Sequence, residues 1–229
     1  MDHILDNPAW NALISGNQEL SNGIEDVKYF NKEVSPFVGL KENSISNFHQ
    51  LYELIQHDSP VAFVNAAETQ IPDCWKVLHL VSAYQMVYNQ ITVPANVNMD
   101  LISLKEENVP EMLALTQLTK PGPFAKKTIE MGHYQGIFED GKLVAMAGQR
   151  LHPSPYAEIS AVCTHPEYLG KGYAKQLLLS QVHRIKAKSE IPFLHVRHDN
   201  ERAIQVYESL GFSTRKEVYF YFLQKEKMG

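Results

Sequence analysis

The segment HPEYLGKGYAKQ, residues 165–176, places two glycines and a lysine in one short turn between a strand-like run and a helix-like run. A strand that leads through such a turn into a helix leaves backbone N–H groups free at the helix N-terminus. Gly170 and Gly172 would let those amides approach a ligand closely. Free amides and the helix dipole together form an anion site, most naturally for phosphate. A plain flexible entry turn explains the same pattern, so the loop alone does not decide.

Two common phosphate-binding loops are excluded by the residues around this turn. Gly-Lys is not followed by Ser or Thr, so the hydroxyl that a P-loop uses to bind magnesium is missing. Tyr173, Ala174 and Lys175 follow Gly172, so the third glycine of the dinucleotide-binding fingerprint is also missing. The loop follows hairpin-like strands and does not open a βαβ unit.

Strand-like and helix-like patterns alternate around this loop. The Asp140-Gly141 pair is a strong hairpin signal, and Gly211 is placed to end a helix. The order indicates an α/β fold whose first half is largely antiparallel. We expect strands at residues 101–104, 133–138, 142–149, 156–164, 192–197 and 217–225, and helices at 108–119, 124–132, 172–189 and 201–211.

Residues 1–91 also predict an α/β arrangement, with no glycine-rich loop and no clustered ligands. Helices are expected at 7–15, 45–55 and 74–88, and strands at 34–40 and 60–67. Pro94, Asn96 and Asn98 interrupt the pattern before a new strand-like run begins. We therefore predict a domain boundary near Val97, with an N-terminal α/β domain at 1–97 and a second domain at 98–229.

Composition limits the class of protein. A net charge of −5 gives no support to nucleic-acid binding. No apolar run reaches the ~20 residues of a membrane span, and the N-terminus lacks the pattern of a secretory signal. Two cysteines, Cys74 and Cys163, are too few for a disulfide framework. We expect a cytoplasmic protein with no nucleic-acid or membrane partner, and the sequence leaves its oligomeric state open, a homodimer included.

Two longer segments carry a resemblance to a known family. AVCTHPEYLGKGYAKQLLL (161–179) followed by LHVRHDNERAIQVYESLGF (194–212) resembles the acetyl-CoA core of the GNAT superfamily of N-acetyltransferases, in particular the branch of glycine N-acyltransferase-like proteins. The family motif Gln/Arg-x-x-Gly-x-Gly/Ala corresponds to residues 169–174, with Leu169 in place of Gln or Arg. The resemblance covers about residues 100–225. It implies a GNAT-type mixed sheet flanked by helices, and an N-terminal domain that either shapes the acceptor pocket or is a degenerate copy of the same fold.

The resemblance implies acetyl-CoA as the cofactor, with CoA as product. In such folds the strand before the loop splays from its neighbour and pairs with the pantetheine arm, and the loop wraps the pyrophosphate. An Asn at the start of the next helix lies near the pantetheine. A plain core strand and an ordinary helix cap are the alternatives. The implied residues are Val162, Cys163, Thr164, Leu169, Gly170, Lys171, Gly172, Tyr173, Ala174, Lys175 and Asn200.

The resemblance also implies catalytic groups. Tyr207 would protonate the departing CoA thiolate, the alternative being an aromatic core residue. His195 stands where ribosomal-protein N-terminal acetylases have the Glu of Leu-Glu-Val-Arg, and an imidazole is a plausible general base. Glu158 is a rival base, and a structural histidine is the alternative for His195. Cys163 is not needed as a nucleophile, and the ten histidines show no metal-ligand spacing.

The predicted function is transfer of an acetyl group from acetyl-CoA to a primary amine by direct attack in a ternary complex. The acceptor is left open between a small amine or amino acid and a protein N-terminus. The competing interpretation is a non-catalytic acyl-CoA sensor that kept the cofactor loop and lost the acceptor chemistry.

Overall fold

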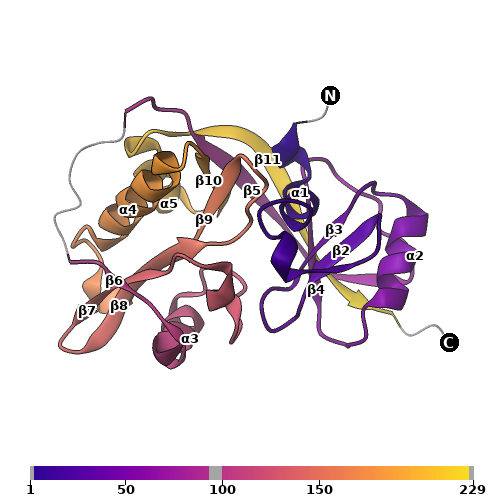
Figure 1. The fold of residues 1–229 in the computed structure, drawn as a ribbon, viewed down its shortest axis with the longest axis horizontal. Helices are drawn as coiled ribbons and strands as arrows, with labels where there is room; N and C mark the ends of the chain where they lie inside the picture. The colour runs from indigo at the N-terminus through magenta and orange to yellow at the C-terminus, as the bar shows by residue number, and fades with distance from the viewer. Residues whose placement is uncertain (1–2, 93–99, 227–229) are drawn as a thin grey trace.

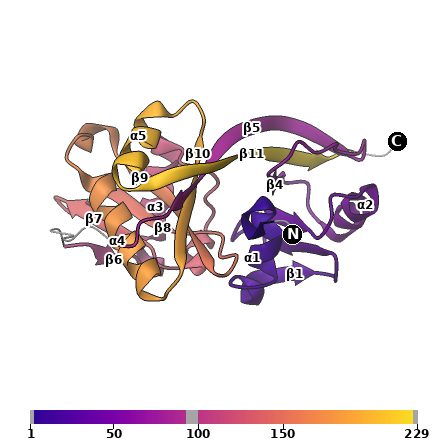
Figure 2. The same ribbon diagram turned by 90° about the horizontal axis from the view of Figure 1, so that it is seen from above.

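One mixed sheet of 11 strands runs through the molecule, in a computed structural model that describes residues 3–92 and 100–226. Figures 1 and 2 show two lobes side by side, joined by two long strands, β5 and β11. The strand order is β1-β2-β3-β4-β11-β5-β10-β9-β8-β7-β6. The predicted domain boundary near Val97 lies outside the described residues.

The N-terminal lobe, residues 3–65, contains two helices and four strands of this sheet. Pro8 stands in the first turn of α1, where its missing N–H is not needed. Ser44 caps α2 by accepting a hydrogen bond from the Asn47 N–H at 3.2 Å. Both helices were predicted, and β3 and β4 fall inside predicted strands. The elements are η1 (Ile4–Asp6), α1 (Pro8–Leu13), η2 (Gln18–Leu20), β1 (Ser21–Gly23), β2 (Val27–Phe30), β3 (Phe37–Leu40), α2 (Ile45–Leu54) and β4 (Val61–Asn65).

The C-terminal lobe, residues 100–211, follows the predicted alternation closely. Asp140 (φ +48°) and Gly141 (φ +75°) form the two-residue turn of the β7–β8 hairpin. The helix predicted at 124–132 is only the 3-10 turn η4. The elements are β6 (Ile102–Ser103), η3 (Glu106–Asn108), α3 (Val109–Thr119), η4 (Thr128–Met131), β7 (Gln135–Glu139), β8 (Lys142–Gln149), β9 (Tyr156–Thr164), η5 (Pro166–Tyr168), α4 (Tyr173–Ala187), β10 (Ile191–Arg197) and α5 (Glu201–Ser209).

The helix predicted at 74–88 is wrong, because these residues form the long strand β5 (Trp75–Tyr88). This strand pairs along its length with β11 (Phe212–Lys225), and its second half also pairs with β10. Apolar side chains point to both faces there, which removes the alternation by which a strand is recognised. β5 therefore lies between two strands of the second predicted domain.

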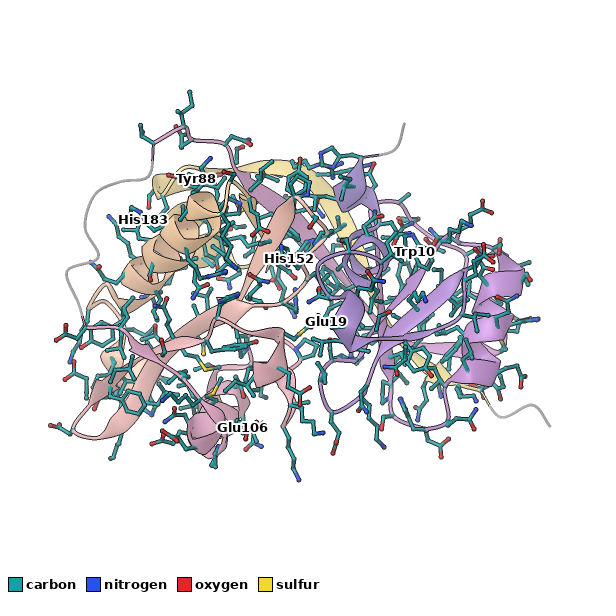
Figure 3. All side chains as sticks on the ribbon, in the orientation of Figure 1. Trp10, Glu19, Tyr88, Glu106, His152 and His183 are labelled. Carbon is teal, nitrogen blue, oxygen red and sulfur yellow. The ribbon has the colours of Figure 1, made fainter. Side chains whose placement is uncertain are left out.

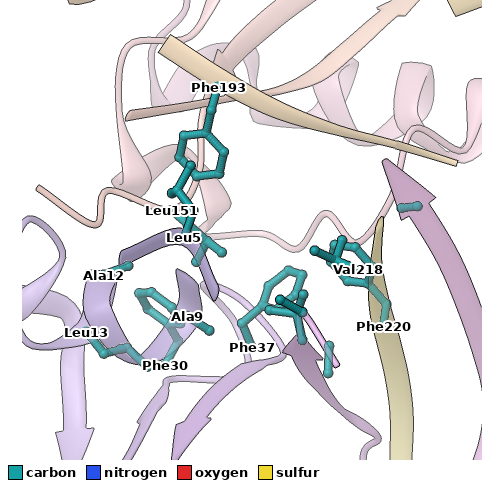
Figure 4. Close-up of a cluster of buried hydrophobic side chains, with 14 of the residues drawn as sticks. Leu5, Ala9, Ala12, Leu13, Phe30, Phe37, Leu151, Phe193, Val218 and Phe220 are labelled. Atoms are coloured by element: carbon teal, nitrogen blue, oxygen red, sulfur yellow. The ribbon is translucent and has the colours of Figure 1, made fainter. Parts of the chain in front are cut away.

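One hydrophobic cluster joins the two lobes. Figure 4 shows side chains from both lobes and from β11 meeting in it. All of the labelled side chains are at most 8% exposed. Because the cluster is shared, the lobes bury a continuous core. Its labelled members are Leu5, Ala9, Ala12, Leu13, Phe30, Phe37, Leu151, Phe193, Val218 and Phe220.

A close backbone contact at His152, a residue labelled in Figure 3, holds the lobes together. The Gly16 N–H donates to the His152 carbonyl at 3.0 Å, and the His152 N–H donates to Asn17 Oδ1 at 2.8 Å. The His152 ring in turn contacts Glu190 Oε1 through Nε2, at 2.7 Å. A Cβ at Gly16 would stand 2.3 Å from the His152 ring and 2.4 Å from its carbonyl oxygen.

Gly16→Ala is expected to destabilise the protein by about 1–3 kcal/mol, because the added methyl group overlaps both the ring and the backbone of His152. Thermal unfolding of Gly16→Ala should show a drop of several degrees. Glu19→Ala, an exposed position three residues further on, is the control and should change little. Equal melting temperatures for the two variants would contradict the proposed contact.

Candidate active site

Strands β9 and β10 pair for three residues and then separate. Their parallel register runs from Ile191↔Tyr156 to Phe193↔Glu158 and stops there, although β9 continues to Thr164 and β10 to Arg197. On its other side β9 stays paired with β8 as far as Thr164. One edge of residues 159–164 therefore has main-chain groups that β10 does not use, which is the splay that the family resemblance implied.

A β-bulge lies within the separated part of β9. Ser160 pairs with Gly148 and Cys163 with Met146, so two residues of β9 stand opposite one residue of β8. Ala161 has φ +52°, a left-handed conformation that costs a non-glycine residue about 1–3 kcal/mol. Such strain is typical of binding and catalytic sites, where surrounding contacts hold it in place.

A cavity of about 400 Å³ opens where β9 and β10 separate, and we call it the cofactor cavity after the predicted cofactor residues that line it. It is lined by the end of β9, by the loop that leads into α4, and by one side of α5. All of the predicted cofactor residues except Lys171 line it, and so does Tyr207. The Lys171 ammonium lies instead 4.7 Å from the centroid of the Tyr168 ring.

The loop geometry suits an anionic ligand. Gly170 and Gly172 have φ of +83° and +80°, and a Cβ built on either would meet nothing within 4 Å. Gly172 is the N-cap of α4 and has no side chain with which to cap this helix end. The first amides of α4 are therefore not capped by the N-cap residue, and the helix dipole favours a negative ligand there. Leu169 is 48% exposed and adds no charged contact.

Two polar side chains at the cavity have unused hydrogen-bonding capacity. Thr164 Oγ1 is buried and has no hydrogen-bond partner in the described structure. A buried hydroxyl without a partner is unfavourable, so its position fits a ligand that completes it. Asn200 accepts the Ala203 N–H through Oδ1 at 3.2 Å and so caps α5, which leaves its amide nitrogen to donate. The residues present therefore fit a ligand with both phosphates and amides.

Tyr207 and Cys163 lie close together where the strands separate. Tyr207 is 9% exposed, and burial, with a smaller contribution from Cys163, raises the pKa of its phenol to about 12. Burial also raises the pKa of the Cys163 thiol to about 11. Both groups are protonated at neutral pH, so Tyr207 can donate a proton and Cys163 is no nucleophile.

His195 does not line the cofactor cavity, and both of its ring nitrogens are bonded. Nδ1 lies 2.6 Å from Glu158 Oε1, and Nε2 lies 3.0 Å from Gln85 Nε2. The Gln85 amide is oriented by its other contacts, because Oε1 accepts from Arg215 and Nε2 donates to the Leu5 carbonyl. The remaining amide hydrogen therefore points at His195 Nε2, which must accept it. This arrangement requires a neutral imidazole with its proton on Nδ1.

Glu158 is fully buried and lies at the last register pair before β9 and β10 separate. Burial alone would raise the pKa of its carboxyl, but Arg150 and then His195 outweigh this and hold the pKa well below its usual range. The carboxylate also accepts the Leu151 N–H at 3.1 Å. The oxygens of Glu158 are occupied by these donors. Neither Glu158 nor His195, the two predicted bases, lines the cofactor cavity.

Some residues around the two strands were not predicted. Arg202 lines the cofactor cavity from the first turn of α5, where its position two residues after Asn200 could have suggested it. Arg150 had no local signal, because its contacts with Glu158 depend on where the end of β8 places it. Among residues 3–92 and 100–226, no group of His, Cys, Asp or Glu side chains could hold a metal ion, and no helix is long and apolar enough to cross a membrane.

Comparisons with known proteins agree on one family. The family described as FR47-like protein matches residues 134–221. A crystal structure of a putative acetyltransferase of the GNAT family from Novosphingobium aromaticivorans aligns with a TM-score of 0.91 and 34% identity, over 99% of this chain and 100% of that one. The chain therefore belongs to the GNAT superfamily of acetyl-CoA-dependent N-acetyltransferases, and the predicted GNAT-type α/β fold is confirmed.

Curated relatives match over about a third of this chain. Mycothiol acetyltransferase of Thermomonospora curvata is 33% identical over 83 residues, which are 34% of this chain and 28% of that protein. The N-alpha-acetyltransferase RimI of Mycobacterium tuberculosis is 34% identical over 84 residues, 35% of this chain and 51% of that protein. The matched region thus spans between about a quarter and a half of these relatives. The narrower resemblance to glycine N-acyltransferase-like proteins stays a prediction.

Gly172→Val should weaken binding of CoA about tenfold or more, because a β-branched residue disfavours the left-handed conformation that holds the α4 amides in place. Lys171→Ala is the matched control in the same loop. It keeps the backbone amide and removes a side chain that lies outside the cavity, so its dissociation constant should stay within about threefold. Calorimetric titration with CoA measures both, and equal affinities would contradict a backbone-mediated site.

Proposed function

We propose that this chain transfers an acetyl group from acetyl-CoA to a primary amine by direct attack in a ternary complex. The observation that carries this proposal is the splay of β9 and β10 beside Tyr207, a buried phenol that is protonated at neutral pH. A cavity with a glycine-rich anion loop at one end and a proton donor at the other suits a thioester carried on a phosphorylated arm.

The protein's own contribution is positioning and hydrogen bonding. Acetyl-CoA, when bound, supplies a thioester that an amine can attack. Main-chain N–H groups of residues 159–164 that β10 leaves free would orient the arm and polarise the carbonyl. As the C–N bond forms, the attacking nitrogen loses one proton to solvent. As the C–S bond breaks, the Tyr207 hydroxyl gives its proton to the sulfur, and solvent returns a proton to the phenolate. Holding both reactants in one geometry supplies much of the rate enhancement.

His195 has a positioning role in this proposal instead of the predicted role of general base. Its Nε2 lone pair accepts a hydrogen bond from the Gln85 amide, and its Nδ1–H donates a hydrogen bond to Glu158. Acting as a base would require Gln85 to release the ring, which is 3% exposed. We infer that the acceptor amine reaches the thioester already neutral, and that His195 keeps Glu158 and Arg150 in place.

The competing function, an acyl-CoA sensor without catalysis, is favoured by one observation. Neither His195 nor Glu158 is free to take a proton from an ammonium group. The retained phenol of Tyr207 in the cavity speaks for catalysis, since a sensor has no leaving group to protonate. Release of CoA thiol with any primary amine would rule out the sensor.

Tyr207→Phe should lower kcat about 100-fold or more and leave the affinity for CoA nearly unchanged, because only the proton donor is removed. Thiol release under saturating acetyl-CoA measures the first and calorimetry the second. Tyr168→Phe, in the same cavity, is the control and should retain activity.

Because the Tyr207 pKa is raised to about 12, this group should cause no loss of rate with increasing pH below about pH 11. A wild-type rate that falls already near pH 9 would contradict this role.

The dependence of kcat/KM on pH should follow the pKa of the acceptor amine. When one acceptor is replaced by another, the acidic limb of the profile should move by the difference between the pKa values of the two amines. The same shift is expected in the wild type and in His195→Gln, because the lone pair of His195 Nε2 is occupied. An acidic limb that stays at the same pH for every acceptor and disappears in His195→Gln would instead establish His195 as the base.

A further inference from the structure

The cofactor cavity contains two cationic side chains and, among the described residues that line it, no acidic one. Lys175 lines it from the first turn of α4, and Arg202 lines it from the first turn of α5. Two cations without a carboxylate favour a ligand that carries negative groups. Since the two cations stand on different helices, the cavity suits a ligand whose negative groups lie at more than one place.

Arg202 has no hydrogen-bond or ion-pair partner within residues 3–92 and 100–226. Both carboxylate oxygens of Asp199, three residues earlier, accept instead from Arg197, at 2.9 and 2.6 Å. Glu201, the residue before Arg202, is exposed and does not line the cavity. The Arg202 guanidinium therefore keeps its N–H donors for water or for a ligand in the cavity.

The side of α5 that lines the cavity has an inner and an outer row of residues. Ala203 and Tyr207, four positions apart, form one row, and Arg202, Val206 and Ser209 form the other. Tyr207 is buried, whereas Arg202 and Ser209 are exposed. The first row therefore faces the separated strands and the second faces the mouth of the cavity. In the proposed function the thiol of CoA lies beside Tyr207, so the nucleotide end lies towards the outer row.

CoA carries negative charge at two places, the pyrophosphate at the end of the pantetheine arm and a phosphate on the 3′-oxygen of the adenosine. The glycine-rich loop and Lys175, at the start of α4, are the predicted partners of the pyrophosphate. Leu169 adds no charge to this loop, and the Lys171 ammonium lies against the Tyr168 ring, outside the cavity. Arg202 is therefore the lining cation that is left for the 3′-phosphate.

We propose that Arg202 binds the 3′-phosphate of CoA and thereby makes the protein select CoA over other carriers of the same pantetheine arm. The inference rests on the cofactor cavity of the proposed function and names the part of the cofactor that this side chain recognises. A guanidinium can donate two parallel N–H bonds to a phosphate, which a lysine cannot. Dephospho-CoA, or a phosphopantetheine arm on a carrier protein, offers the same thioester without this phosphate and should be a poor substitute.

The first test compares ligands on the wild-type protein by calorimetric titration with CoA, 3′-dephospho-CoA and 4′-phosphopantetheine. CoA should bind about tenfold more tightly than 3′-dephospho-CoA, the lower end of the range for hydrogen bonds to a charged group, because Arg202 is exposed to solvent. This preference should shrink as the salt concentration rises. The acetylated forms of CoA and 3′-dephospho-CoA should differ in KM and have kcat values within about twofold, since the 3′-phosphate is far from the reacting atoms.

The second test changes the side chain. Arg202→Ala should bring the affinities for CoA and 3′-dephospho-CoA to within about threefold of each other, and should leave the affinity for 3′-dephospho-CoA within about threefold of the wild type. Arg202→Lys keeps the charge but loses the paired N–H donors, so it should retain only part of the preference. Lys76→Ala removes an exposed cation of β5 that lies outside the cavity, and this control should keep the wild-type preference.

The outcomes separate this inference from the proposed function. Equal affinities of the wild type for CoA and 3′-dephospho-CoA, or a preference that persists in Arg202→Ala, would overturn the assignment of Arg202 and leave acetyl transfer intact. If Arg202→Ala weakened the binding of both ligands by the same factor, Arg202 would bind the pyrophosphate, and the inference would be overturned as well. A wild-type protein that binds none of the three ligands would overturn the cofactor cavity on which the proposed function itself rests.

Discussion

The buried carboxylate of Glu158 is the group around which the rest of the site is arranged. It receives hydrogen bonds from Arg150, from the Leu151 backbone and from His195, and it is fully shielded from solvent. A lone carboxylate in such surroundings would be highly unfavourable, so its partners must all be present for the fold to tolerate it. Its place in the chain matters as much as its charge, because it stands at the last residue pair before β9 and β10 separate.

The same carboxylate ties both lobes to the site. His195, bonded to Glu158, also contacts Gln85 of β5, whose amide is fixed by the Leu5 carbonyl and by Arg215. Arg215 reaches Asp6 at 2.6 Å, across 209 residues of sequence. Pairs of this kind contribute less to net stability than to specifying one arrangement, since desolvation offsets much of their attraction. The network therefore fixes the relative positions of β9, β10 and the N-terminal segment.

Local signals were enough to predict most elements of the C-terminal lobe. Asp140-Gly141 identified a hairpin, and alternating and helical periods identified β9 and α4 to within two residues. β5 was mistaken for a helix because it is buried on both faces in its second half and takes its conformation from pairing with β10 and β11. Tertiary pairing of this kind overrides local preference and leaves no period to detect.

The residues of the candidate site also divide into those that the sequence could predict and those that it could not. The loop glycines and Asn200 could be predicted, since an anion loop and a helix cap are local features with local residue requirements. The hydrogen bonds of His195 could not be, because they depend on a glutamine 110 residues away. Arg150 was missed for the same reason, because its contacts with Glu158 depend on how β8 and β9 pair.

The sheet makes it difficult for the cofactor-binding half to fold and function alone. A chain beginning at residue 100 would lack β5, which lies between β10 and β11 and pairs with both. It would also lack Gln85, whose amide orients His195, and Phe37, whose ring packs against the Arg150 guanidinium. The residues that resemble the acetyl-CoA core thus contain the cofactor loop, while the position of Arg150 and His195 on the opposite side of β9 depends on the first 88 residues. The N-terminal lobe thus contacts both His195 and Arg150, the two side chains that hold Glu158 where β9 and β10 separate.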